Sequence, residues 1–238
     1  MIGTVMQDGA MADLLDIREA AEFLRVSETS LRRWTNAGRL PCLRIGGRRE
    51  RRFRRSDLLA FLGTAGDGAQ AATHNHFCVF YTSDVDRARA AAAFLATALQ
   101  PDVLCLLVAA KDVQRIVISL LEQDRPSIQN DVRAGRLAVA EYCDSATAQL
   151  DYWNRRLRAA RDDGMSRVQL VADVSGGGLG GGEGGGRLPF AEILDYEAEY
   201  GRSIARRFPV TTLCQYDARR LSGLDAAALL QCHDGARH

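Results

Sequence analysis

The chain has 238 residues, enough for one large domain or two smaller ones with separate cores. Its formal net charge is +1 and 47% of its residues are hydrophobic, which excludes a disordered or a uniformly basic chain. Neither a secretory leader nor an apolar run long enough to span a bilayer is recognisable, and the six cysteines form no CxxC pair. We therefore expect a cytoplasmic protein from a reducing compartment.

The first 63 residues predict a small helical domain behind a flexible leader, residues 1–12. Asp16 and Glu19 fit a capping box, and apolar residues recur at helical spacing over the following turns. After a tight turn at residues 25–27, Ser27 is expected to cap a second helix, residues 28–37, which Gly38 ends. Two short helices joined in this way are typical of a helix-turn-helix.

The next segment, LPCLRIGGRRERRFRR at residues 40–55, predicts a β-wing. Leu43 and Ile45 alternate with Arg44, and Gly46 and Gly47 mark the reversal. Six arginines surround one apolar residue on the return, and guanidinium groups so placed can bind phosphates or enter a minor groove. Ser56 is then expected to cap a closing helix, residues 57–62.

Charge is concentrated in the same region. From Arg25 to Arg55 there are eleven arginines and only two acidic residues, a local charge of +9 on a nearly neutral chain. A basic field of this kind is typical of a small nucleic-acid-binding module.

The string SETSLRRWTNAGRLPCLRIGGRRERRFRRSDLLAFL resembles the excisionase-family, MerR-like winged helix-turn-helix over residues 13–63. The resemblance implies binding to double-stranded DNA. It places Ser30, Arg32 and Arg33 in the major groove. It places four wing residues on the backbone or in the minor groove: Arg44, Arg48, Arg49 and Arg52.

Residues 64–73 are small, polar and rich in glycine, which indicates a linker to a second domain at residues 74–238. In that domain apolar runs alternate with helix-like stretches. The expected strands are residues 77–81, 103–109, 137–142, 168–174 and 211–216. The expected helices are residues 84–99, 111–122, 146–163 and 189–207. This alternation predicts a doubly wound α/β sheet.

Such sheets bind ligands in a crevice at the carboxyl ends of their strands. The candidate effector-binding residues there are Tyr81, Asp173, Ser175, Gln215, Tyr216 and Asp217. A glycine tract at residues 176–186 follows one strand and is interpreted as a loop that folding does not require.

Catalytic and metal chemistry find little support in the sequence. Residues 81–87, after the first strand of the second domain, carry carboxylates where a phosphate-binding loop needs glycines and a lysine. His74, His76 and Cys78 lie at the linker boundary and His233 lies near the C-terminus, so we expect neither a metal nor a cofactor. No nucleophile with its base can be assembled, and the protein is predicted not to be an enzyme.

Three further strings, HFCVFYTSDVDRARAAAAFLATAL, VQLVADVS and TTLCQYDARRL, resemble in order the MEDS sensory domain of DcmR-type, dichloromethane-responsive regulators. The resemblance implies a RecA/KaiC-like core that senses a small organic compound. With the first domain, it indicates a homodimeric, effector-controlled transcriptional regulator, with repression preferred. Two alternatives remain: an excisionase-like architectural protein with an oligomerisation domain, and a DNA-targeted NTPase.

Overall fold

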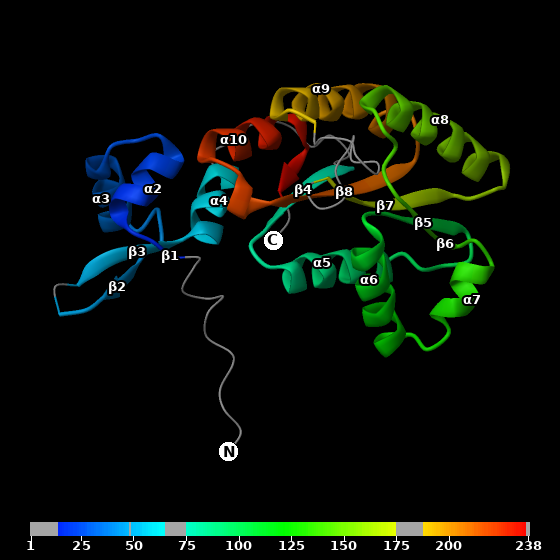
Figure 1. The fold of residues 1–238 in the computed structure, drawn as a ribbon, viewed down its shortest axis with the longest axis horizontal. Coiled ribbons are helices and arrows are strands. Elements are labelled where there is room, and N and C mark those ends of the chain that lie inside the picture. Colours follow the sequence, from blue (N-terminus) through cyan, green and yellow to red (C-terminus); the bar gives the residue numbers. More distant parts are fainter. Residues whose placement is uncertain (1–13, 48, 65–74, 175–187, 237–238) are drawn as a thin grey trace, which may run out of the picture.

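The computed structural model describes residues 14–47, 49–64, 75–174 and 188–236. Figure 1 shows a small N-terminal domain that contacts a larger α/β domain. Residues 65–73 of the predicted linker, the glycine tract, Ser175, His74 and Arg48 lie outside the described residues, whereas Thr64, predicted to begin the linker, belongs to a helix. In the described part of the chain, no helix combines the length and apolar character needed to cross a bilayer.

The small domain combines three helices with a three-stranded sheet in the order β1-β3-β2. Its elements are β1 (Leu14–Leu15), α2 (Ile17–Leu24), α3 (Glu28–Asn36), β2 (Leu43–Ile45), β3 (Glu50–Arg54) and α4 (Arg55–Thr64). The helix-turn-helix predicted from the sequence is confirmed, because α2 and α3 are joined by the turn at residues 25–27.

Side chains at the helix starts determine where α2 and α3 begin. Asp16 and Glu19 form the predicted capping box, with Asp16 Oδ1 accepting from the amides of residues 18 and 19, each at 2.8 Å. Ser27 Oγ accepts from the amide of Ser30 at 3.2 Å and caps α3. The first of these helices ends at Arg25 in the left-handed region, with φ +53°.

The wing is also confirmed, with two corrections around it. β2 and β3 pair antiparallel, and Gly46 takes φ +75° at the reversal. α4 begins at Arg55, so Ser56 lies inside the helix and is not its cap. The sequence also did not predict β1, which pairs with β3 and places Leu15 opposite Phe53. Phe53 is fully buried in the core of the domain.

The large domain contains six parallel strands in the order β6-β5-β7-β8-β4-β9. The strands are β4 (His76–Tyr81), β5 (Val103–Val108), β6 (Leu137–Ala140), β7 (Arg167–Asp173), β8 (Val210–Asp217) and β9 (Gly235–Ala236). The helices are α5 (Asp84–Ala96), α6 (Lys111–Asp124), α7 (Ile128–Arg133), α8 (Ala146–Asp162), α9 (Phe190–Tyr200) and α10 (Gly223–Cys232). All five predicted strands are present, with ends shifted by one or two residues.

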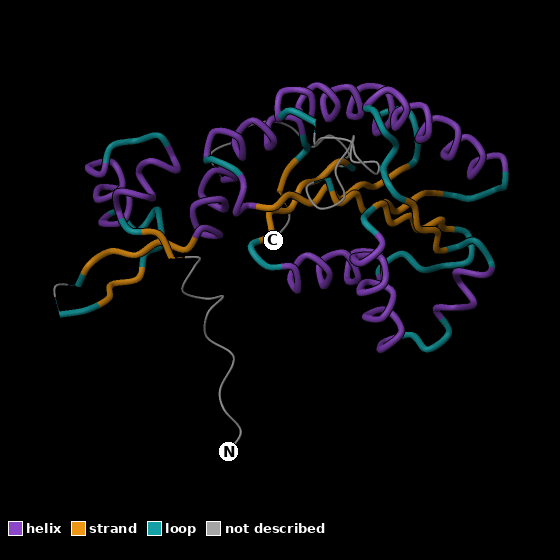
Figure 2. Tube along the Cα trace, in the orientation of Figure 1, coloured by secondary structure: helices purple, strands orange, loops and turns teal. Residues whose placement is uncertain are grey.

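Helices cover both faces of this sheet. Figure 2 shows the strands as a layer between two layers of helices, with α5, α6 and α7 on one side and α8, α9 and α10 on the other. Alternate residues of β5 explain the arrangement: Cys105 and Leu107 join the core under α5 and α6, whereas Leu104 and Leu106 join the core under α8 and α9. The α/β domain with a parallel sheet is therefore confirmed.

The two domains share a core, which the sequence did not predict. Ala226 of α10 is packed among the buried residues of the small domain. At Gly223, the first residue of α10, an ideal Cβ would lie only 2.1 Å from the carbonyl oxygen of Phe23, so a larger residue does not fit. Arg55 of α4 donates to the carbonyl oxygens of Ala218 and Leu221 at 3.0 and 3.2 Å.

Candidate functional site

The exposed face of α3 carries the three residues assigned to the major groove. Arg32 and Arg33 are exposed, and Arg32 forms an ion pair with Glu28 at 2.8 Å, one turn earlier on the same helix. Ser30 is half-buried, and its Oγ lies 3.1 Å from that of Ser27. Ser30 therefore belongs partly to the helix start, whereas the two arginines are directed toward solvent.

The wing holds the second group of cations. Arg44 on β2 and Arg49 in the turn are exposed, and Arg49 takes φ +51°. Arg52 on β3 is half-buried and forms an ion pair with Glu50 at 3.0 Å. Because one of the paired residues is mostly exposed, this ion pair contributes little to stability and leaves the guanidinium available.

A hollow of 390 Å³ joins the wing to the two helices. It is lined by Asp16, Ile17, Arg18, Arg32, Arg49, Glu50, Arg51 and Arg52. Three predicted DNA-binding residues thus meet in one basic depression, while Arg33 and Arg44 lie outside its lining. Sequence reasoning missed Arg51, which donates to Thr35 Oγ1 at 3.2 Å and to Asn36 Oδ1 at 2.7 Å and so fixes the wing against α3.

The paired substitution Arg49→Ala and Arg52→Ala is expected to weaken binding to every DNA sequence. Each phosphate contact contributes about −0.9 to the slope of log K against log salt concentration, so losing two contacts makes the slope shallower by about 1.8. Fluorescence anisotropy over a range of salt concentrations measures this slope. Arg155→Ala with Arg158→Ala, two exposed arginines of α8, is the control with the same loss of charge. An unchanged slope in the wing variant would remove Arg49 and Arg52 from the interface.

At the strand ends, three of the six candidate effector-binding residues meet on the face of the sheet that α5 covers. Tyr81 Oη lies 3.5 Å from Asp173 Oδ1, and Gln215 Nε2 donates to the carbonyl oxygen of Arg87 at 2.9 Å. Arg87 of α5 also donates to Asp173 Oδ2 at 3.2 Å, and both residues are buried. Burial alone would lower the pKa of Arg87, but Asp173, Tyr81 and Asp84 together outweigh it and raise that pKa.

The start of α5 has the wrong charge for a phosphate site. Ser83 caps the helix, with Asp84 and Asp86 in its first turn, and Ser83 Oγ donates to Asp86 at 2.6 Å. Two carboxylates at a helix N-terminus take the place that an anionic ligand would need. This is the position at which the sequence lacked a phosphate-binding loop.

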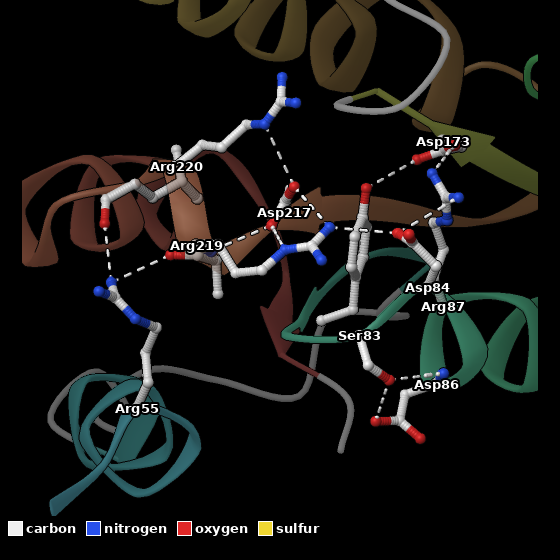
Figure 3. Close-up of polar contacts among 12 residues, drawn as sticks. Arg55, Ser83, Asp84, Asp86, Arg87, Asp173, Asp217, Arg219 and Arg220 are labelled. Carbon is white, nitrogen blue, oxygen red and sulfur yellow. Dashed lines mark hydrogen bonds and ion pairs between the residues drawn. The ribbon is translucent and has the colours of Figure 1, made fainter. Parts of the chain in front are cut away.

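A series of ion pairs leads from Asp173 to the small domain, as Figure 3 shows. Arg87 contacts Asp84 at 3.4 Å, Asp84 contacts Arg219 at 3.1 Å, and Arg219 contacts Asp217 at 2.8 Å. The short helix η2 (Ala218–Arg220) follows Asp217, and it is there that Arg55 of α4 donates to a backbone carbonyl. The strand ends and the small domain are thus joined by direct polar contacts.

A cavity of 290 Å³ lies beside these contacts, between the two domains. It is lined by Ser56, Leu59, Val79, Phe80, Tyr81, Thr82, Asp86, Ala90 and Ala236. Ser56 and Leu59 belong to α4 of the small domain, whereas the other residues belong to the α/β domain. A molecule in this cavity would touch both domains and the ring of Tyr81.

Tyr216, another of the predicted effector-binding residues, is not part of this group. It lies on the opposite face of the sheet and donates to Glu197 Oε1 of α9 at 2.5 Å. Glu197 is fully buried, and its other oxygen lies 3.2 Å from His76 Nε2 and 3.5 Å from His233 Nε2. Cys214 Sγ lies 3.6 Å from the same carboxylate oxygen.

Burial and the polar neighbours together determine the ionisation of this second group. Loss of water lowers the pKa of His233 to about 4, so its ring is neutral at pH 7. Burial opposes ionisation of Glu197, but the hydrogen bond from His76 and the other polar neighbours outweigh it and lower the pKa of this carboxyl. Three side chains that can each bind a metal ion therefore surround a buried carboxylate, and no local sequence motif brings these four residues together.

Comparison with known proteins accounts for both domains. Residues 75–234 match the model of the MEDS domain, described as MEthanogen/methylotroph, DcmR Sensory domain, and residues 14–65 match a helix-turn-helix domain model. The Transcriptional repressor DcmR of Methylorubrum extorquens (strain DSM 6343 / CIP 106787 / DM4) is 30% identical over 247 residues, covering 93% of this chain and 90% of that protein. No solved structure matches the chain.

Proposed function

Because the chain belongs to the DcmR-like family of helix-turn-helix regulators with a MEDS sensory domain, we propose that this DNA-binding regulator is a repressor released by a small organic molecule. The observation that carries the proposal is the cavity between the domains, since a ligand there contacts the DNA-binding domain directly. We further propose that the protein acts in the cytoplasm and has no catalytic activity.

On DNA, α3 lies in the major groove through Arg32, Arg33 and Ser30, and the wing contacts the backbone or minor groove. Support comes from the exposed arginines of α3 and from the basic hollow that joins α3 to the wing. One small module buries little surface, and specific operators usually combine two half-sites about 34–36 Å apart. The functional unit in this proposal is therefore a homodimer.

The effector binds in the interdomain cavity, which Tyr81 lines, whereas the other described candidates, Asp173, Gln215, Tyr216 and Asp217, do not line it. The cavity is large enough for a small organic molecule, and most of its lining is apolar. Asp173 and Gln215 do not contact the effector but position the residues around Tyr81. Asp173 contacts the hydroxyl of Tyr81, and Gln215 donates to the backbone carbonyl of Arg87. We also propose that the α/β domain has a RecA/KaiC-like core. Helices on both faces of a parallel sheet support this fold.

The protein is released from its operator because the ligand has different affinities for the docked and undocked arrangements of the two domains. In the docked arrangement α4 closes one side of the cavity. A ligand that binds more tightly when α4 moves away shifts the population toward the undocked form, in which the spacing of the two half-site domains is no longer fixed. A difference of about 1.4 kcal/mol in ligand binding lowers operator affinity tenfold.

Filling the cavity should separate DNA binding from the response. In Ala90→Phe the ring occupies the space beside Tyr81, so we expect operator affinity within about twofold of the wild type and loss of the ligand response. The assay is fluorescence anisotropy with labelled DNA from upstream of the protein's own gene, titrated with dichloromethane and with short-chain alcohols and amines.

Ala93→Phe is the matched control, because Ala93 is exposed one turn further along α5. It should retain the full response. A response that survives in Ala90→Phe would remove the cavity from the proposal. A wild type that binds its upstream DNA equally with every compound would favour the architectural alternative, and nucleotide turnover by the pure protein would favour the NTPase.

A further inference from the structure

Four metal-binding side chains converge in the core of the α/β domain, away from the interdomain cavity. They come from four separate places in the fold: His76 from the first residue of β4, Glu197 from α9, Cys214 from β8, and His233 from the end of α10. All four are buried, and their ligand atoms lie within 4.8 Å of one another. Because they are separated by up to 157 positions in the chain, no short motif indicates them.

Four of the six distances among these atoms are close to those of a tetrahedral zinc site. Zinc binds nitrogen and oxygen at about 2.0–2.2 Å and sulfur at about 2.3 Å, so neighbouring ligand atoms lie about 3.3–3.8 Å apart. Glu197 Oε2 lies 3.2, 3.5 and 3.6 Å from His76 Nε2, His233 Nε2 and Cys214 Sγ. Cys214 Sγ lies 3.4 Å from His76 Nε2. We propose that these four atoms bind one zinc ion.

The ring of His233 provides independent support. Its Nδ1 lies 2.7 Å from the carbonyl oxygen of Leu229, which can only accept, so Nδ1 carries the proton. Nε2 then presents a lone pair toward Glu197, and this buried atom has no hydrogen-bond partner among the described residues. A cation between these two facing acceptors would satisfy both of them. A ring nitrogen bonded to a backbone carbonyl is also the usual support of a metal-binding histidine.

The charge of the buried Glu197 carboxylate also favours a zinc ion at this site. Among the described residues, neither lysine nor arginine forms an ion pair with Glu197, and a buried carboxylate without a cation is costly. When zinc binds, the thiol of Cys214 releases its proton to solvent, and the resulting thiolate and the carboxylate neutralise the ion. Tyr216, which donates to Glu197 Oε1, orients the carboxylate, giving this residue a role other than effector binding.

The site would hold α10 against the sheet. His233 directly follows α10, whose first residue, Gly223, contacts the small domain. Zinc at one end of this helix therefore supports the docking surface at the other end. Raising free zinc to a hundred times its Kd should raise the Tm of the full-length protein by about 5–10 °C.

The test uses the full-length protein stripped with a chelator and reloaded with cobalt or zinc. We expect one cobalt ion per chain, with the intense visible bands of a tetrahedral site and a thiolate-to-cobalt charge-transfer band. Cys214→Ser should lose the charge-transfer band. Cys78→Ser is the matched control and should keep it, because Cys78 lies opposite Cys214 on the neighbouring strand but is outside the ligand group.

Zinc-edge X-ray absorption of the wild type decides the matter even if Cys214→Ser does not fold. One sulfur and three nitrogen or oxygen neighbours are expected. A site with no sulfur, a six-coordinate ion, or a folded protein that takes up no metal would overturn the proposal, as would a charge-transfer band that depends on Cys78.

Discussion

Gly223→Ala is expected to lower operator affinity by about 10- to 100-fold while both domains stay folded. A Cβ at this position would lie 2.1 Å from the carbonyl oxygen of Phe23 and 2.8 Å from its carbonyl carbon, so α10 and α2 must separate. Forced overpacking of this kind costs about 1–3 kcal/mol. When the DNA-binding domains are undocked, binding of one domain presents the other to its half-site at a lower effective concentration. This lower effective concentration accounts for the loss of operator affinity.

Fluorescence anisotropy measures this loss, and far-UV circular dichroism establishes that both domains remain folded. Gly201→Ala is the control, because a Cβ there meets its nearest atoms at 3.7 and 3.9 Å, an ordinary contact. Binding to nonspecific DNA should change little in either variant, since the wing arginines are intact. Wild-type operator affinity in Gly223→Ala would show that docking does not set the spacing of the DNA-binding domains.

Asp173→Asn is expected to lower the Tm of the protein by about 5–15 °C. Asp173 is fully buried and only 10% of the Arg87 side chain is exposed, so the substitution leaves a guanidinium largely without water and without its main counter-charge. Breaking a buried pair typically costs about 3–5 kcal/mol, and the remaining contact with Asp84 reduces this to about 2–4 kcal/mol. For a chain of this size each kcal/mol shifts the Tm by about 2–4 °C.

Differential scanning calorimetry measures the shift, with Asp84→Asn as the control. Asp84 contacts the same arginine, but 61% of its side chain is exposed, so its loss should cost at most about 1 kcal/mol. Equal Tm values for Asp173→Asn and the wild type would mean that water or another group compensates Arg87. The strand-end contacts would then contribute nothing to the link between the domains.

The strands and most helices could be predicted because their sequence patterns reflect local burial. The near-continuous apolar run of β5 indicates a strand covered on both faces, and the structure covers it on both. α7 and α10 were missed, and so were β1 and β9, which have only two residues each. Their formation depends on tertiary contacts: β1 exists by pairing with β3, and α10 packs on the small domain.

Site residues could be predicted from the sequence where they lie on one element or two adjacent elements. They could not be predicted where they come from distant parts of the chain. α3 and the wing present their arginines locally, so the helix-turn-helix assignment held. Period-two alternation could have separated Gln215 from Tyr216, because neighbours in a strand point to opposite faces of the sheet. Nothing local indicates that Arg51 binds Asn36, or that His233 returns to His76, since these contacts depend on how the chain folds back on itself.

Hydrogen–deuterium exchange of the full-length protein tests effector-controlled docking most directly. The comparison is between the protein alone and the protein with the compound that weakens operator binding. We expect faster exchange in α4 and α10 when the compound binds, with no change in the central strands β5, β7 and β8. Unchanged exchange in both helices, at a compound concentration that releases DNA, would contradict effector-controlled docking.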